Sequence, residues 1–142
     1  MGALRHVDSC FGCSTSNPSA LGIVLSSTPD GAEGRVRFGA ETEGAPGLVH
    51  GGLLATFDDE VMGFVQHGGN AVRVTAEMTI RYRRPTQVDT DLCCRAQVVD
   101  TTGRRLHVHA VITTADDEST ALAEVDATYV LLVPKDPAEH GS

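Results

Sequence analysis

Asp59 stands nine residues after His50, and a glycine pair, Gly51-Gly52, follows that histidine directly. A carboxylate can act as a general base on water or as a nucleophile toward a carbonyl carbon. Glycine lets a backbone approach a ligand closely because it has no Cβ. If a helix begins at this pair, its first N–H groups and the positive end of its dipole can stabilise an oxyanion. The spacing is therefore typical of a site for carbonyl chemistry.

The element that must position these residues is a helix that starts near Gly51. Its apolar positions recur at helical spacing and predict one buried stripe: Leu54, Phe57, Val61 and Val65. Asp59 is predicted to point away from that stripe. The neighbours of Asp59 on that side are small, which favours close approach of another backbone: Gly52, Ala55, Thr56 and Gly63. Asp58 and Glu60 lie about 100° to either side of Asp59 and are interpreted as charges that flank the stripe. Gly68-Gly69-Asn70 predicts that the helix ends before residue 68.

The distance between Gly51 and Asp59 constrains how they act. They are eight positions apart, which is about 12 Å along a helix. An oxyanion donor and a base must each lie within about 3 Å of their target atoms on one carbonyl group. One helix cannot provide both, whereas two antiparallel copies around a two-fold axis can. We therefore expect a homodimer whose active site is shared between subunits.

Almost all of the remaining chain is predicted to be strand. Two short strands precede the helix, at 21–27 and 34–40, and four follow it, starting near 74, 92, 106 and 123. In the first of these four, the even positions are apolar and are predicted to face inward: Ala76, Met78, Ile80 and Tyr82. Short connections between the later strands favour antiparallel pairing. The predicted fold is α+β, with a curled antiparallel sheet of five to six strands packed on one long helix. The predicted organisation is an arm at 1–20, one domain at 21–133 and a flexible tail at 134–142.

Composition excludes several function classes. The chain has 142 residues, a formal net charge of −8, no tryptophan and 4% aromatic residues. A nucleic-acid partner is not expected, because the chain has no large basic block and few aromatic residues for base stacking. No apolar run approaches the roughly 20 residues of a membrane helix, and the start lacks a signal-peptide pattern. We expect a cytoplasmic protein without a membrane partner.

Four cysteines and several histidines are candidate metal ligands. Cys10 and Cys13 form one C-x-x-C motif, whereas Cys93 and Cys94 are adjacent on a strand and point to opposite faces. A structural zinc site at the motif would need further ligands, for example His6, and a redox pair is the other alternative. Reduced thiols are the default in the cytosol. A further pair, His107 and His109, shares one strand face without a carboxylate nearby in sequence, and is interpreted as solvated. No metal site is predicted.

The spacing from His50-Gly51-Gly52 to Asp59 resembles the signature of hotdog-fold acyl-CoA thioesterases of the phenylacetate-pathway and THEM type. Three further stretches agree with it: Cys10 to Cys13 leading to Asn17-Pro18 and Leu21-Gly22, Thr75 to Pro85, and Ala123 to Tyr129. The resemblance covers roughly residues 10 to 133. It implies a hotdog fold, a homodimer that often pairs into a tetramer, and hydrolysis of an acyl-CoA thioester without a metal or redox cofactor.

The resemblance also implies roles for individual residues. Asp59 acts on the thioester, as general base for water or as nucleophile, and the Gly51 N–H donates to the oxyanion, with Gly52 beside it against the substrate. His50 either contacts the substrate carbonyl or only stiffens the turn through a local hydrogen bond. Thr75 matches a Ser or Thr that holds the attacking water, although a plain strand threonine explains it equally well.

Two further points concern substrate binding. Coenzyme A carries phosphates, so basic residues are expected at the pocket mouth, and the candidates are Arg83, Arg84, Arg104 and Arg105. Related proteins of the THEM type carry an asparagine six residues before the histidine of the motif, where this chain has Gly44. Help from an amide side chain is therefore lost or supplied elsewhere. The alternative functions are an acyl-thioester hydratase or dehydratase, and a non-catalytic acyl-CoA-binding protein.

Overall fold

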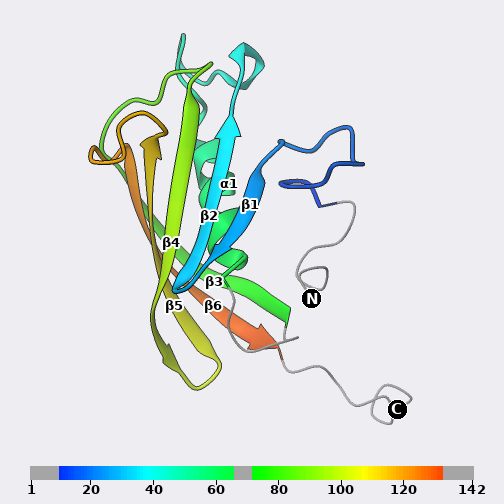
Figure 1. Cartoon of the computed structure of the whole chain (residues 1–142), viewed down its shortest axis with the longest axis vertical. Helices are drawn as coiled ribbons and strands as arrows, with labels where there is room; N and C mark the ends of the chain where they lie inside the picture. The colour runs from blue at the N-terminus through cyan, green and yellow to red at the C-terminus, as the bar shows by residue number, and fades with distance from the viewer. Residues whose placement is uncertain (1–9, 66–71, 133–142) are drawn as a thin grey trace.

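Helix α1 (Gly51–Gly63) lies against one face of a curled antiparallel sheet, which wraps around it in the computed structural model (Figure 1). The structure describes residues 10–65 and 72–132. Within these ranges there are six strands: β1 (Val24–Thr28), β2 (Gly31–Arg37), β3 (Val72–Tyr82), β4 (Asp91–Thr102), β5 (Arg105–Thr114) and β6 (Ala123–Leu132). A short 3-10 turn at Ala40–Thr42 precedes the helix. The predicted order of two strands, one helix and four strands is confirmed.

The strands are arranged in the order β1-β2-β4-β5-β6-β3, and every neighbouring pair is antiparallel. Strands β4, β5 and β6 are neighbours, as their short connections predict. Strand β3 does not pair with β4, which follows it in the chain, but lies at the far edge beside β6 (Figure 1). The chain therefore crosses the sheet twice around the helix, and all of the later strands can contact α1.

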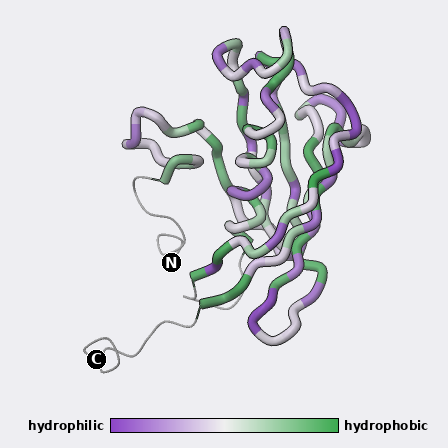
Figure 2. The backbone as a smooth tube through the Cα atoms, turned by 180° about the vertical axis from the view of Figure 1, so that it is seen from behind, coloured by the Kyte–Doolittle hydropathy of each residue, from purple (hydrophilic) through white to green (hydrophobic). Residues whose placement is uncertain are grey.

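The core lies between the helix and the sheet. The predicted stripe is confirmed, because all four of its members are buried: Leu54, Phe57, Val61 and Val65. The ring of Phe57 packs edge-on against Phe38, with ring centroids 6.2 Å apart. Hydrophobic stretches, drawn in green, lie along the strands, whereas the hairpin loops are largely hydrophilic (Figure 2).

The interpretation of Asp58 as a flanking charge is wrong. Its exposed fraction is 0%, and it occupies a core position of the helix. Asp58 lies one turn after Leu54 and one turn before Met62, and both of these residues are buried. The buried sector of the helix is thus wider than the apolar residues alone indicated, because strand β4 covers this side as well.

The predicted alternation along β3 is correct at one end of the strand and wrong at the other. Met78 and Ile80 pack against the core as expected. A bulge between Thr75 and Glu77 then shifts the register, so that Thr75 lies opposite the buried Tyr129. A bulge adds one residue to a strand and reverses the faces beyond it. Ala76 is accordingly exposed instead of inward, and Thr75 faces the helix.

The segment before β1 lies outside the sheet and is held by backbone hydrogen bonds. The N–H of Leu21 donates to the Phe11 carbonyl over 2.9 Å, and that of Ile23 to the Gly12 carbonyl over 3.0 Å. Strand β1 begins only after this segment, at Val24, three residues later than predicted. The stop signal at 68–70, the start of the predicted arm and the tail at 134–142 lie outside the described residues. In the part of the chain that is described, no helix has the length and apolar character needed to span a membrane.

Candidate active site

The carboxylate of Asp59 is held by two hydroxyl groups from different strands. Its Oδ1 accepts a hydrogen bond from Thr75 Oγ1 over 2.7 Å and one from the Tyr129 phenol over 2.8 Å. The phenol also lies 3.2 Å from the Asp59 backbone carbonyl. No residue among those described donates to Oδ2. The side chain is thus fixed through one oxygen, while the other remains available to a water molecule or a substrate.

Tyr129 was not singled out by sequence reasoning as a site residue. It is 2% exposed, and burial, followed by the nearby charge of Asp59, raises the pKa of its phenol. The phenol therefore stays protonated and acts as a hydrogen-bond donor. The signal in the sequence was the inward position of a tyrosine on the last strand, because a buried phenol requires a polar partner.

The start of α1 is a tight local turn. His50 is the N-cap, and its Nδ1 accepts a hydrogen bond from the Gly52 N–H over 2.9 Å. The Tyr82 phenol donates to the Gly51 carbonyl over 2.8 Å and ties this turn to β3. The Gly51 N–H has no acceptor among the described residues, which leaves it available to an anion. His50 therefore has the local capping role, and the N–H of Gly52 is already used.

The position where related proteins carry an asparagine lies beside this turn. A Cβ on Gly44 would be 3.0 Å from His50 Cα, which is closer than ordinary packing allows. The backbone here approaches His50 directly, so a larger residue at position 44 would require the turn to move.

One chain does not bring all the candidate residues together. Thr75 and Tyr129 surround Asp59 near one end of the helix, whereas Gly51 and Tyr82 meet at the other end. The separation of eight positions between Gly51 and Asp59 corresponds to about 12 Å. A single carbonyl group cannot contact both ends, as the spacing in the sequence also indicated.

A second carboxyl group, that of Asp58, lies on the buried side of the helix. Burial raises the pKa of Asp58 to about 8, against an opposing hydrogen bond from Cys94 and with a smaller contribution from the adjacent charge of Asp59. The Cys94 thiol lies 3.5 Å from its Oδ1, and its Oδ2 has no hydrogen-bond partner within the described ranges. Asp58 is therefore a neutral acid at neutral pH, with no access to substrate.

The candidate arginines lie near both ends of the helix. Arg83 and Arg84 follow Tyr82, and both of their backbone N–H groups donate to the Leu122 carbonyl, near the Gly51 turn. Arg105 pairs with Val130 at the other end, one position from the tyrosine that contacts Asp59. Arg83 is already in an exposed ion pair with Glu124 at 3.0 Å. Neither Arg84 nor Arg105 forms an ion pair with a carboxylate of the described chain.

The two strand histidines are partly exposed, as expected, and they have polar partners from distant parts of the sequence. Strand pairing places His109 opposite Asp126, with Nδ1 2.9 Å from Oδ1, and His107 opposite Thr128, with Nδ1 3.0 Å from the hydroxyl. The hydrogen bond from His109 is the main reason that the pKa of Asp126 is lowered. These pairs join strands across the sheet and lie on its face away from the helix.

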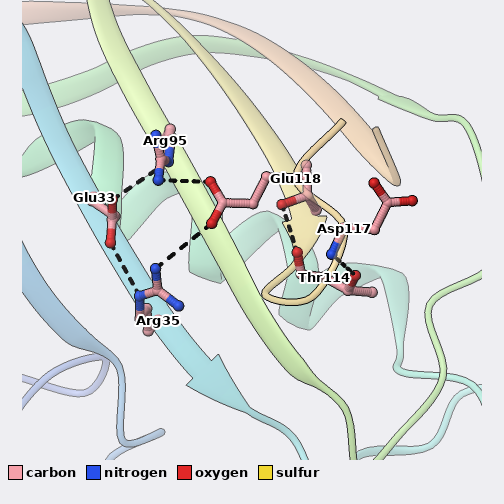
Figure 3. A network of polar contacts seen from close by, with 7 residues as sticks. Glu33, Arg35, Arg95, Thr114, Asp117 and Glu118 are labelled. Carbon is pink, nitrogen blue, oxygen red and sulfur yellow. Dashed lines mark hydrogen bonds and ion pairs between the residues drawn. The ribbon is translucent and has the colours of Figure 1, made fainter. Parts of the chain in front are cut away.

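A hollow of about 450 Å³ lies over β2, β4 and β5 on the face of the sheet away from α1. Beside it, Glu33 and Glu118 each contact both Arg35 and Arg95 (Figure 3). The two acids and the two arginines balance one another. None of the candidate active-site residues lines this hollow.

The adjacent residues Cys93 and Cys94 point to opposite faces of the sheet, as predicted. Cys94 belongs to the core that faces the helix.

Comparisons with known proteins agree with this architecture. The profile of the Thioesterase superfamily matches residues 46–121, more than half of the chain. Mouse (Mus musculus) acyl-coenzyme A thioesterase THEM4 is 32% identical over 99 residues, which cover 70% of this chain and 42% of the mouse protein. The chain thus matches less than half the length of the curated relatives it resembles.

Solved structures share the fold over most of the chain. The crystal structure of a thioesterase superfamily protein superposes with a TM-score of 0.76 and 28% identity, covering 86% of this chain and 60% of that one. A Bacillus halodurans protein, crystallised with CoA, superposes with a TM-score of 0.63 and 27% identity, covering 70% and 66%. With the curled six-stranded sheet around α1, these matches show that the chain belongs to the thioesterase superfamily and has its hotdog fold.

Proposed function

We propose that this chain hydrolyses acyl-CoA thioesters to a free acid and coenzyme A. The observation that carries the proposal is the Asp59 carboxylate, which is fixed through Oδ1 by Thr75 and Tyr129 and has an available Oδ2. The printed name of the mouse relative and the CoA in the Bacillus halodurans structure support the choice of substrate.

The chemistry follows from the positions of these groups. Asp59 Oδ2 accepts a proton from a water molecule as the water oxygen forms a bond to the thioester carbonyl carbon. The Gly51 N–H of a second subunit, at the positive end of its helix, donates to the resulting oxyanion. The tetrahedral intermediate then loses coenzyme A as the C–S bond breaks, and the proton held by Asp59 passes to the leaving sulfur. Water, the carboxylate and the amide suffice for these steps.

The shared site requires a homodimer, which we propose as the smallest active unit. Strand β3 is at the edge of the sheet, where unpaired backbone groups favour pairing with another strand. The start of β3 and the end of β6 are apolar and exposed (Figure 2), with exposed fractions of 58% for Val72, 42% for Val74 and 44% for Leu132. A second copy covers such a surface. The dimers pair further into a tetramer in this proposal.

The two-fold arrangement also brings together arginines from both ends of the helix. Arg84 of one subunit lies near its Gly51 turn, and Arg105 of the other subunit lies near Asp59. In the dimer these two arginines then lie on the same side of the shared site. Neither side chain forms an ion pair with a carboxylate within the described ranges, and both are the proposed contacts for the phosphates of coenzyme A. Arg83 and Arg104 are secondary candidates, the former because of its ion pair with Glu124.

The test is thiol release from a panel of acyl-CoA esters by the purified chain. Asp59→Asn keeps the shape of the side chain and the oxygen that accepts from Thr75 but removes the base, so we expect kcat to fall by roughly 10²–10⁴. Asp116→Asn, at an exposed acid in the β5–β6 loop, is the matched control and should keep full activity. Unchanged turnover in Asp59→Asn would reject the assignment.

Isotope labelling separates the two roles of Asp59. In a single turnover in H₂¹⁸O with enzyme in excess, a general base places ¹⁸O in the product acid. A nucleophile forms a mixed anhydride, and attack of water on its Asp59 carbonyl carbon leaves ¹⁸O in the Asp59 carboxylate, which mass spectrometry of the peptide detects. Attack on the acyl carbonyl carbon labels the product acid, as a general base does, so label in the peptide is the diagnostic result. Label in that peptide would overturn the general-base step but not the thioesterase activity.

The alternative functions are addressed by the same preparation. A hydratase requires a histidine and a carboxylate at the acyl chain, whereas His50 Nδ1 already accepts a hydrogen bond from Gly52. Water addition to an enoyl-CoA without thiol release would nevertheless identify a hydratase. Tight binding in calorimetry without hydrolysis of any ester would identify a non-catalytic binding protein.

A further inference from the structure

The segment that precedes β1 meets the catalytic helix at Glu60, next to Asp59 in sequence but on another side of the helix. The Cys10 thiol lies 3.1 Å from Glu60 Oε2. One ligand atom from each of Cys10, Cys13 and Glu60 lies within 4.8 Å of the other two. Residues far apart in the chain thus place two sulfurs and one carboxylate oxygen around a single point.

These distances suit one tetrahedral ion. Sulfur ligands lie about 2.3 Å from zinc and carboxylate oxygens about 2.0–2.2 Å, so two sulfurs on one ion are about 3.8 Å apart. The three ligand atoms lie within 4.8 Å of one another, at most about 1 Å more than this spacing. The pair of cysteines also has the C-x-x-C spacing that zinc sites use. We propose that Cys10, Cys13 and Glu60 bind one thiophilic divalent cation of the zinc type.

The backbone around the motif supports a built site. A Cβ on Gly12 would lie 2.5 Å from Glu60 Oε1, so a larger residue between the two cysteines would displace the carboxylate from its present position. The Ser14 N–H donates to the Cys10 carbonyl over 3.0 Å, which closes the motif into one turn. The N–H of the buried Ile23 donates to the Gly12 carbonyl and attaches this turn to the core.

The ligand atoms also suit the charge of a divalent cation. The Cys10 thiol donates to Glu60 in the metal-free chain, and both thiols lose their protons when a cation binds, so that two thiolates and one carboxylate compensate its charge. The hard oxygen ligand and the two soft sulfurs together favour zinc over magnesium or calcium, which prefer oxygen alone. A water molecule or a further side chain provides the fourth ligand.

The bound cation would act as a structural cross-link. It joins the segment from residue 10 to the helix that carries Asp59, through the neighbouring residue. This inference does not depend on the proposed function, because the cross-link forms whether or not the chain hydrolyses thioesters.

The experiment is a titration of the metal-free full-length chain with Co²⁺, under reducing conditions, followed by competition with Zn²⁺. We expect one equivalent per chain with sulfur-to-metal charge-transfer absorption, and displacement of Co²⁺ by Zn²⁺. Cys10→Ser and Cys13→Ser should lose that absorption, and Glu60→Gln should retain it but weaken Co²⁺ binding by at least about tenfold. Cys93→Ser, which removes a thiol away from the site, is the matched control and should bind as the unaltered chain does.

Two results would overturn the proposal. One is binding by the unaltered chain that is no tighter than binding by Cys10→Ser, with both shown to be folded by circular dichroism. The other is a Glu60→Gln variant with unchanged Co²⁺ affinity and spectrum, which would show that the carboxylate is not a ligand. Neither result would bear on thiol release from acyl-CoA, so the proposed function is tested separately.

Discussion

Replacing Asp58 by asparagine should remove a pH dependence of stability that is built into the core. Asp58 is fully buried, and its pKa is raised to about 8 in the folded chain, whereas a carboxyl group in an unfolded chain titrates near about 3.9. Between these values the folded state keeps a proton that the unfolded state has released. The contribution of Asp58 to stability therefore decreases as pH rises, by about 1.4 kcal/mol per pH unit.

Across the two units from about pH 5 to 7, this amounts to a loss of about 3 kcal/mol. Asp58→Asn does not titrate, and its amide oxygen can still accept from Cys94. The amide nitrogen replaces an oxygen that has no hydrogen-bond partner among the described residues, which adds a cost that does not vary with pH. The free energy of unfolding of the variant, minus that of the unaltered chain, should thus increase by about 3 kcal/mol over this range.

The assay is urea unfolding at several pH values and one protein concentration, because the unfolding of the proposed dimer would depend on concentration. Asp117→Asn is the control. Hydrogen bonds from Ser119 lower the pKa of Asp117. The contribution of Asp117 to the free energy of unfolding is therefore present above about pH 4 and is lost only as pH falls further. Its difference curve should be flat from pH 5 to 7. A flat curve for Asp58→Asn as well would refute the reasoning, since it would mean that Asp58 is ionised in the folded core.

Three further substitutions test the geometry of the helix. Tyr129→Phe removes a hydrogen-bond donor to Asp59. We expect kcat to fall about tenfold, equivalent to about 1.4 kcal/mol, while KM changes by less than about twofold. An unchanged kcat would contradict a positioning role for Tyr129. Tyr82→Phe releases the Gly51 carbonyl, and urea unfolding should show a loss of about 1 kcal/mol, which would be absent if water replaced the bond. Gly34→Ala puts a Cβ directly against a Val61 methyl group. Overpacking should lower the free energy of unfolding by about 1–3 kcal/mol, measured by the urea midpoint. A variant of unchanged stability would show that β2 can move away from α1.

Periodicity was sufficient for the elements of the fold. The stripe from Leu54 to Val65 and the alternation through Met78 and Ile80 depend on local spacing, and both are confirmed. Element order followed directly from these patterns. The position of β3 beside β6 did not, because strand pairing depends on which distant segments meet and not on the pattern within one strand.

Resemblance placed Thr75 near Asp59, and the structure brings their side chains to 2.7 Å. Alternation alone would have put Thr75 on the outer face. The bulge that reverses this face is not visible in the sequence, since Ala76 is as apolar as the inward residues that follow it. Whether these residues act on a thioester stays a prediction until turnover is measured.

By itself, the sequence determined the helix with its glycine start, the number of strands and the separation between Gly51 and Asp59, because each depends on local spacing along the chain. Only the tertiary structure decided that Asp58 is a buried neutral acid, that Tyr129 holds Asp59, and that Glu60 meets Cys10 and Cys13. The reason is physical: burial, pKa and ligand geometry are set by atoms from segments tens of residues apart, whose approach no local pattern records.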